Sequence, residues 1–314
     1  MNSIKKFFPI LLLAIFIFLL QFYYKKNVSD FEFVKNINFN LILIIIILCF
    51  IYLITEGSIL RNIVRSLNKD ISLKESFLVM NSTYFCNTFV QLSGLGFRVY
   101  YLKKYKNLQI SNVINLSIYT IACEILVFSF FGLMSLFFID LISEKIKINL
   151  IIYLVFISFF SSSLIYLFLN EKILLFLNFS KFLKFKILKK IISLLFPELK
   201  NKKKFFIQQT FLFCLQYLIL LTIFSVILYY LKIEDFFYLS LLITSLVDFS
   251  FLFALTPYSV GITEFVTVLG TRDTLLSFAE IIVLINLFRV CMLIIYFIIG
   301  PIFIIYKAMR KNGV

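Results

Sequence analysis

The chain consists mainly of apolar runs about as long as a membrane is thick, separated by short polar and basic stretches. Six runs read as single spanning helices: Phe7–Tyr24, Leu41–Leu60, Val113–Ile139, Asn149–Leu169, Phe205–Leu231 and Phe278–Tyr306. A spanning α-helix needs about 20 apolar residues, which these runs approach or exceed. The first run lacks a small-residue cleavage site, so we interpret it as a retained helix and not as a signal peptide.

Two further apolar stretches, Ser76–Leu102 and Phe236–Gly270, are interrupted by small and polar residues. The interruptions lie at Gln91–Gly96 and Thr256–Gly261. Irregular backbone at membrane depth is tolerated only where protein or a water-filled cavity surrounds it. Both stretches therefore indicate a polar cavity within a helix bundle. Re-entrant half-helices and tight pairs of full crossings both fit the pattern.

The basic residues predict which loops face the cytoplasm, because short cytoplasmic loops are enriched in lysine and arginine. Segment 171–204 carries ten lysines, and basic clusters also lie at residues 61–74, 103–106 and 307–311. All of them fall on one side only if each interrupted stretch enters and leaves on the same side. We therefore expect both termini to be cytoplasmic, in an inner (cytoplasmic) membrane. Segment 171–204 is either an interfacial segment on anionic lipid or a plain solvated connector.

The order of elements repeats along the chain. Residues 1–139 give helix, helix, interrupted stretch, helix, and residues 148–314 give the same order with the opposite orientation in the membrane. We predict an all-α, polytopic membrane helix bundle forming one transmembrane domain. It would have about six full crossings, two re-entrant or paired short segments, and an inverted-topology repeat. Many secondary transporters use this architecture to alternate access to a site near the bilayer midplane.

Composition supports a membrane protein and excludes several classes of enzyme. The chain is 62% hydrophobic, against about 45–50% for a soluble domain. It contains no histidine, its five cysteines stand singly, and it has no nucleotide-binding loop, so we expect no metal or other cofactor. The net charge of +15 does not indicate nucleic acid, because the lysines collect in loops beside apolar runs.

Four charged residues fall within apolar runs: Arg98, Glu124, Glu264 and Arg289. A charge at the bilayer centre costs about 2.5–3.5 kcal/mol on insertion scales, so each needs a partner or a cavity. The spacing from Gly96 to Glu124 equals that from Gly261 to Arg289, with the signs exchanged. Arg98 with Glu124 and Glu264 with Arg289 are the natural pairs, although crossed pairs fit equally well.

These charges have a structural and a functional interpretation. They are either ion pairs that hold the bundle together or a site where the two arginines bind an anionic lipid headgroup, since guanidinium binds phosphate bidentately. In the second case Gly94, Gly96, Pro257 and Gly261 would let backbone amides approach the same headgroup.

Two further acidic residues lie in apolar surroundings. Asp248, inside the second interrupted stretch, is either a coupling site that titrates or binds a cation, or a satisfied polar contact between helices. We expect Glu56, near the end of the second helix, to be interfacial.

Two motifs resemble a known family. They are Asn81–Leu102, and Pro257–Glu264 followed by Asn286-Leu287-Phe288-Arg289. They are similar to the flippase-like proteins related to the membrane region of lysylphosphatidylglycerol synthase. That family shows an Asn…Pro-x-x-x-G-x-x-R-like motif, a Pro-x-x-x-G-x-x-E motif and an arginine in the last helix. Leu92 departs from it, standing where proline is common.

The resemblance implies a lipid translocase that moves an anionic phospholipid or a polyprenyl-phosphate-linked lipid between leaflets. The full synthases also carry a soluble aminoacyl-transfer domain, which this sequence does not include, so we do not expect aminoacyl-lipid synthesis. The alternative is a non-catalytic membrane subunit that recruits a glycosyl- or acyltransferase to lipid. An intramembrane enzyme is disfavoured, because no paired carboxylates, nucleophile with base, or metal cluster is readable.

Overall fold

The computed structural model describes residues 34–35, 37–90, 92–138, 144–169, 201–233, 235–251, 259–271 and 276–311. The predicted helix Phe7–Tyr24, most of the basic segment 171–204, and Pro257 lie outside these residues.

The described part of the chain is helical throughout, with short connections. Its helices are α2 (Phe39–Ser66), α3 (Leu73–Phe89), α4 (Ser93–Lys106), α5 (Ile110–Phe138), α6 (Glu144–Leu169), α9 (Lys202–Tyr230), α10 (Phe236–Phe251), α11 (Ile262–Gly270) and α12 (Phe278–Lys311). Five of them (α2, α5, α6, α9 and α12) contain apolar segments long enough to cross a membrane. The chain is a polytopic membrane helix bundle, as predicted.

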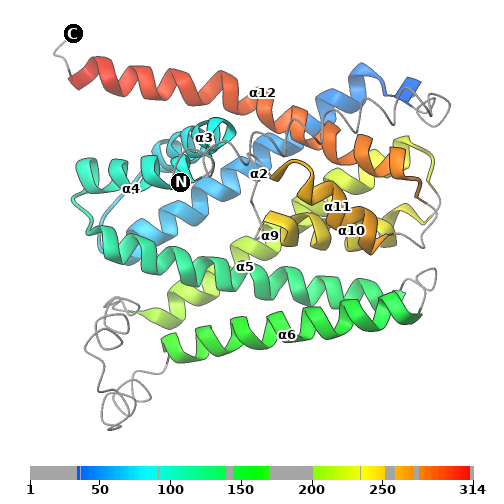
Figure 1. The fold of residues 1–314 in the computed structure, drawn as a ribbon. Coiled ribbons are helices and arrows are strands. Elements are labelled where there is room, and N and C mark those ends of the chain that lie inside the picture. Colours follow the sequence, from blue (N-terminus) through cyan, green and yellow to red (C-terminus); the bar gives the residue numbers. More distant parts are fainter. Residues whose placement is uncertain are drawn as a thin grey trace, which may run out of the picture.

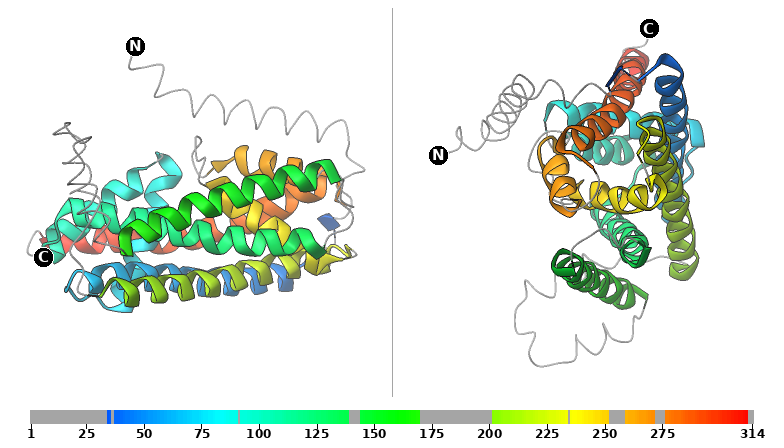
Figure 2. Two further views of the ribbon diagram at one scale, coloured as in Figure 1. Left: turned by 90° about the horizontal axis from the view of Figure 1, so that it is seen from below. Right: turned by 90° about the vertical axis from the view of Figure 1, so that its right-hand side faces the viewer.

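The long helices run alongside one another, and the short ones form two hairpins at opposite ends of the bundle (Figures 1 and 2). Hairpin α3–α4 lies at the end where α2 finishes and α5 starts, and hairpin α10–α11 at the end where α9 finishes and α12 starts. Each interrupted stretch therefore enters and leaves at the same end, as the basic loops required.

The hairpin helices are too short to be spanning helices. At 1.5 Å per residue, the 17 residues of α3 and the 16 of α10 extend about 25 Å, and the 9 of α11 about 14 Å. The hydrocarbon core of a bilayer is about 30 Å thick. Of the two alternatives left open by the sequence, these lengths favour re-entrant segments over pairs of full crossings.

The start of α3 is joined to the end of α4. Glu75 accepts a hydrogen bond from the Tyr101 hydroxyl (2.7 Å) and pairs with Lys106 (2.9 Å). At the opposite end of the hairpin, the Asn87 side chain accepts from the Gly94 backbone N–H (2.8 Å). The chain reverses through Leu92, which adopts the left-handed conformation (φ 64°). Both ends of the hairpin are thus fixed by polar contacts.

Small residues let α3 approach its neighbours closely. A Cβ on Gly57 of α2 would lie 2.9 Å from the Phe77 Cα, and one on Gly300 of α12 would lie 2.6 Å from the Phe85 Cβ. The Ser82 hydroxyl donates to the Gly300 carbonyl (3.2 Å). Helices inside a membrane are not driven together by the hydrophobic effect. They associate through close backbone approach at small residues and through hydrogen bonds between helices, as here.

In the described bundle, helices of one half pack against helices of the other half in a symmetric pattern. Helix α2 packs on α9, hairpin helix α3 packs on α12 of the other half, and α10 packs on α5 in return. Helices α4 and α11 each contact the long helix that follows them. This reciprocal packing is the arrangement expected of an inverted repeat.

One end of the bundle, where α2, α6 and α12 finish and α5 and α9 begin, is strongly basic (Figure 1). We call it the basic end. Its described cations outside α12 are Arg61, Arg65, Lys69, Lys74, Lys103, Lys104, Lys106, Lys202, Lys203 and Lys204, against the acids Asp70 and Glu75.

Gly94→Ala should destabilise the protein, because a Cβ there would lie 2.0 Å from the Thr83 carbonyl oxygen and 2.7 Å from the Asn87 Oδ1. Overpacking of this kind costs about 1–3 kcal/mol. Gly96→Ala is the matched control, since its Cβ would meet nothing within 4 Å. Thermal unfolding in detergent should show a lower midpoint for the first variant alone. Equal midpoints would contradict the close contact between α3 and α4.

Candidate functional site

The second half of the chain contains a buried ion pair between Glu264 on α11 and Arg289 on α12. The two side chains are 2% and 6% exposed, and Arg289 Nη1 donates to Glu264 Oε1. Arg289 Nη1 also donates to Asn286 Oδ1 (3.1 Å), one turn earlier on α12. Of the pairings considered from sequence, this one is formed, and it fastens the short helix α11 to α12.

Glu264 also caps the helix that carries it. Its Oε2 accepts a hydrogen bond from the Gly261 backbone N–H (2.8 Å), three residues earlier, at the first turn of α11. Gly261 has φ 86°, a left-handed value that favours glycine. A carboxylate at this position also interacts favourably with the helix dipole. Gly261 thus shapes the start of α11, and its amide is engaged by Glu264.

The corresponding residues of the first half, Arg98 on α4 and Glu124 on α5, share a cavity of about 120 Å³. We call it the Arg98 cavity; α2, α3 and α9 complete its walls. In the described part of the chain no ion pair within 4 Å joins Arg98 to Glu124. Arg98 Nη1 contacts the Met80 sulfur at 3.8 Å, and its buried Nε has no hydrogen-bond partner. A thioether is a weak acceptor, so this guanidinium is poorly satisfied.

The location predicted for Glu56 from the sequence differs from its location in the structure. The expectation that it is interfacial is wrong: α2 continues to Ser66, and Glu56 is buried (7% exposed) and lines the Arg98 cavity. Its Oε1 accepts from Gln216 Nε2 on α9 (2.7 Å), and the Tyr84 hydroxyl lies beside it. Glu56 therefore lies opposite Arg98 as a second acidic neighbour.

Asp248 on α10 belongs to the same polar interior. It is 7% exposed and close enough to Glu124 and Glu56 to interact with them electrostatically. Among the described residues, no group of three or more acidic or cysteine side chains is placed to hold a metal ion. Glu56 and Glu124 thus line the cavity together with Arg98, and Asp248 lies near these two carboxylates.

A row of three hydrogen-bonded side chains links α2, α9 and α5. Asn62 Nδ2 donates to Gln209 Oε1 (3.1 Å), and Gln209 Nε2 donates to Thr120 Oγ1 (3.0 Å). Gln209 is fully buried, and Thr120 lines the Arg98 cavity. Sequence reasoning passed over this row, although Gln209 and Gln216 are seven positions apart in a predicted spanning helix, which puts both amides on one face of that helix.

The glycines of the first interruption differ in environment. The N–H of Gly94 is engaged by Asn87, whereas Gly96 is exposed and faces open space. Gly94 therefore serves the packing of the hairpin.

Together, the five apolar helices, the paired short helices and the buried charges define a polytopic membrane protein with a polar interior. The chain belongs to the family of the lysylphosphatidylglycerol synthase transmembrane region, which matches residues 7–300. Membership of this family indicates a lipid-related role in the membrane. Comparisons with curated proteins and with solved structures find no match.

Arg289→Gln should lower the free energy of unfolding by about 3–5 kcal/mol, because it leaves the Glu264 carboxylate buried without its partner. The double variant Glu264→Gln/Arg289→Gln should lose less than the sum of the two single variants, since neither charge is then left unpaired. Denaturant unfolding in detergent micelles measures all three. Strict additivity would contradict a stabilising pair.

Proposed function

We propose that the protein moves an anionic, phosphate-bearing lipid between the leaflets of the membrane. The headgroup would pass through the polar interior at the Arg98 cavity, while the acyl chains stay in the surrounding lipid. The family supports a lipid-related role, and the charged side chains inside the bundle support the choice of this cavity for the headgroup.

The observation that carries the proposal is the poorly satisfied guanidinium of Arg98. A cation in a membrane interior is costly unless it has strong acceptors. Arg98 has a thioether contact and a buried Nε without a partner, beside a cavity large enough for a phosphate-sized group or a few waters. Phosphate oxygens would accept bidentate, charge-assisted hydrogen bonds from this guanidinium.

The carboxylates then act as exchange partners for the arginines. Glu56 and Glu124 share the cavity with Arg98 and would hold its guanidinium between transport events. In the other half, Glu264 already holds Arg289 in a closed pair. The arginine of the first half thus lies beside a cavity, whereas the arginine of the second half is held in an ion pair. Alternating access requires this kind of asymmetry in each state, with the Glu264–Arg289 pair opening in the opposite state so that Arg289 engages the headgroup.

The proposed location is an inner (cytoplasmic) membrane, with the basic end of the bundle and both termini facing the cytoplasm. The support is the concentration of lysine and arginine at that end.

Arg98→Gln should slow translocation at least tenfold, since it removes the charge that would engage the headgroup. Reconstituted liposomes carrying fluorescent phosphatidylglycerol, with a quencher that reaches only the outer leaflet, measure the rate. Arg98→Lys should give an intermediate rate, because ammonium keeps the charge without the bidentate fork.

Lys103→Gln, an exposed position on the same helix, is the matched control and should leave the rate unchanged. A wild-type rate in Arg98→Gln would refute the assignment of the cavity. Absence of translocation in the wild type across several anionic and polyprenyl lipids would instead favour the role of a subunit that recruits a lipid-modifying enzyme.

Cysteine labelling tests the orientation. A cysteine replacing Lys69, at the basic end, should react with a membrane-impermeant maleimide only after permeabilisation of cells. A cysteine replacing Lys232, which follows α9 at the opposite end, should react in intact cells. The unmodified chain, with its five native cysteines, is the background control. The reverse pattern of labelling would overturn the orientation.

A further inference from the structure

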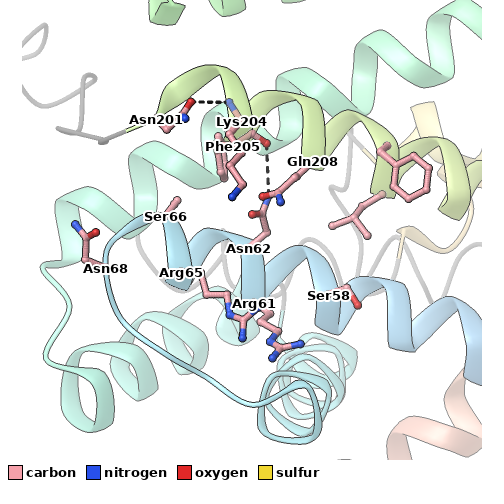
Figure 3. Close-up of a pocket in the computed structure, with 12 residues that line it drawn as sticks. Ser58, Arg61, Asn62, Arg65, Ser66, Asn68, Asn201, Lys204, Phe205 and Gln208 are labelled. Carbon is pink, nitrogen blue, oxygen red and sulfur yellow. Dashed lines mark hydrogen bonds between the residues drawn. The ribbon is translucent and has the colours of Figure 1, made fainter.

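A second, larger cavity lies on the other flank of α2, between α2 and α9 at the basic end (Figure 3). We call it the α2–α9 groove; its volume is about 520 Å³. Its charged lining residues are Arg61 and Arg65 from α2 and Lys204 from α9. Figure 3 shows Lys204 and Asn62 extending from α9 and α2 toward each other, and Arg61 and Arg65 extending from α2 on the side away from α9 in this view.

The groove carries an excess of positive charge. Among the described residues, its three cations lie near the carboxylate of Asp70, which is 80% exposed and pairs with Arg65 (Nε to Oδ1, 3.2 Å). Arg61 is anchored by the donation of its Nε to the Ile71 carbonyl (3.1 Å), which fixes the guanidinium beside the groove. The first turn of α9 adds backbone N–H groups to the same end, and a helix N-terminus favours anions. The groove is therefore suited to an anionic group.

The other part of the groove is apolar and faces the lipid. Phe211 and Leu212 line it, and Phe211 is 67% exposed. Phe211 lies seven residues beyond Lys204 on α9, about 10 Å deeper along the helix axis. Cations at the basic end followed by exposed apolar side chains match a molecule with an anionic headgroup joined to hydrocarbon. A free phosphate compound would leave the apolar part without a partner.

Hydrogen-bonded side chains join the lining of the groove to the lining of the Arg98 cavity. Asn62 lines the groove, Thr120 lines the cavity, and Gln209 is hydrogen-bonded to both. We infer that the α2–α9 groove is a binding site for the phosphate headgroup of a membrane phospholipid, separated from the Arg98 cavity by this row of three side chains. The binding site does not require that the protein translocate lipid.

Native mass spectrometry of the purified full chain in detergent tests the inference. Three probes are titrated: phosphatidylglycerol, diacylglycerol with the same acyl chains, and glycerol phosphate. The groove variant is Arg61→Gln/Lys204→Gln, and the matched control is Lys69→Gln/Lys103→Gln, which removes two exposed cations from the same end outside the groove. Arg98→Gln is measured in parallel.

The wild type should bind phosphatidylglycerol, and the groove variant should bind it at least tenfold more weakly, a change of 1.4 kcal/mol or more. The control should stay within about twofold of the wild type. Lys204→Glu should also weaken binding, and it leaves the Arg61–Ile71 contact in place, so a loss there does not come from a disturbed loop.

Four results would overturn the site. Equal loss in the groove variant and the control would assign binding to surface charge in general. Equal binding of diacylglycerol would show that the phosphate is not recognised. Displacement of the lipid by glycerol phosphate at a similar concentration would show that the groove takes a soluble phosphate compound. Loss confined to Arg98→Gln would place binding in the cavity and refute the groove, whereas failure of translocation with intact groove binding would refute the proposed transport alone.

Discussion

The constraint on which this structure depends is that a helix interrupted inside a membrane must be enclosed by other protein. Backbone groups freed at the breaks have no water to satisfy them in hydrocarbon. Here the breaks are placed within hairpins that pack between long helices, and glycines set the spacing. Gly57 and Gly300 admit the backbone of α3 from two sides, and Gly94 brings the start of α4 against α3. The Asn87 side chain then takes up the amide freed at the turn. Packing and backbone satisfaction are thus achieved by the same few residues.

Enclosing the breaks also brings charged residues into the interior, and the two halves treat them differently. In the second half the Gly261 amide donates to Glu264 Oε2, and Arg289 donates to Oε1 and, at 3.5 Å, to Oε2, so the same carboxylate forms the helix cap and the ion pair. In the first half Arg98 has no such partner among the described residues, and it shares a cavity with Glu56 and Glu124. The two halves thus carry corresponding charged residues in the sequence, but these residues make different contacts in the structure. A protein that alternates between two states would show such a difference between its halves in each state.

The sequence predicted the features that depend on local composition. Apolar length identified the spanning helices, and loop charge required both interrupted stretches to return to the side they entered from. The pairing of Glu264 with Arg289 was among the pairs considered. Glu56 was misplaced because the apolar run seemed to end near Leu60, whereas helix propensity and packing against α9 extend α2 to Ser66. The contact of Glu56 with Gln216 joins residues far apart in the chain, and hydropathy carries no information about which interior polar residues meet.

The row Asn62, Gln209 and Thr120 has a cost that bears on function. Gln209 is fully buried, and a buried amide that loses its hydrogen bonds costs about 1–3 kcal/mol for each unsatisfied group. Gln209 lies in the packed interface between α2 and α9, where an apolar side chain would pack without that cost. The row joins the lining of the α2–α9 groove to the lining of the Arg98 cavity through side-chain hydrogen bonds. A headgroup moving between these spaces would replace the amide's hydrogen bonds with its own, so that Gln209 stays satisfied during passage. Apolar side chains at the same place could not replace the hydrogen bonds to water that a charged headgroup loses.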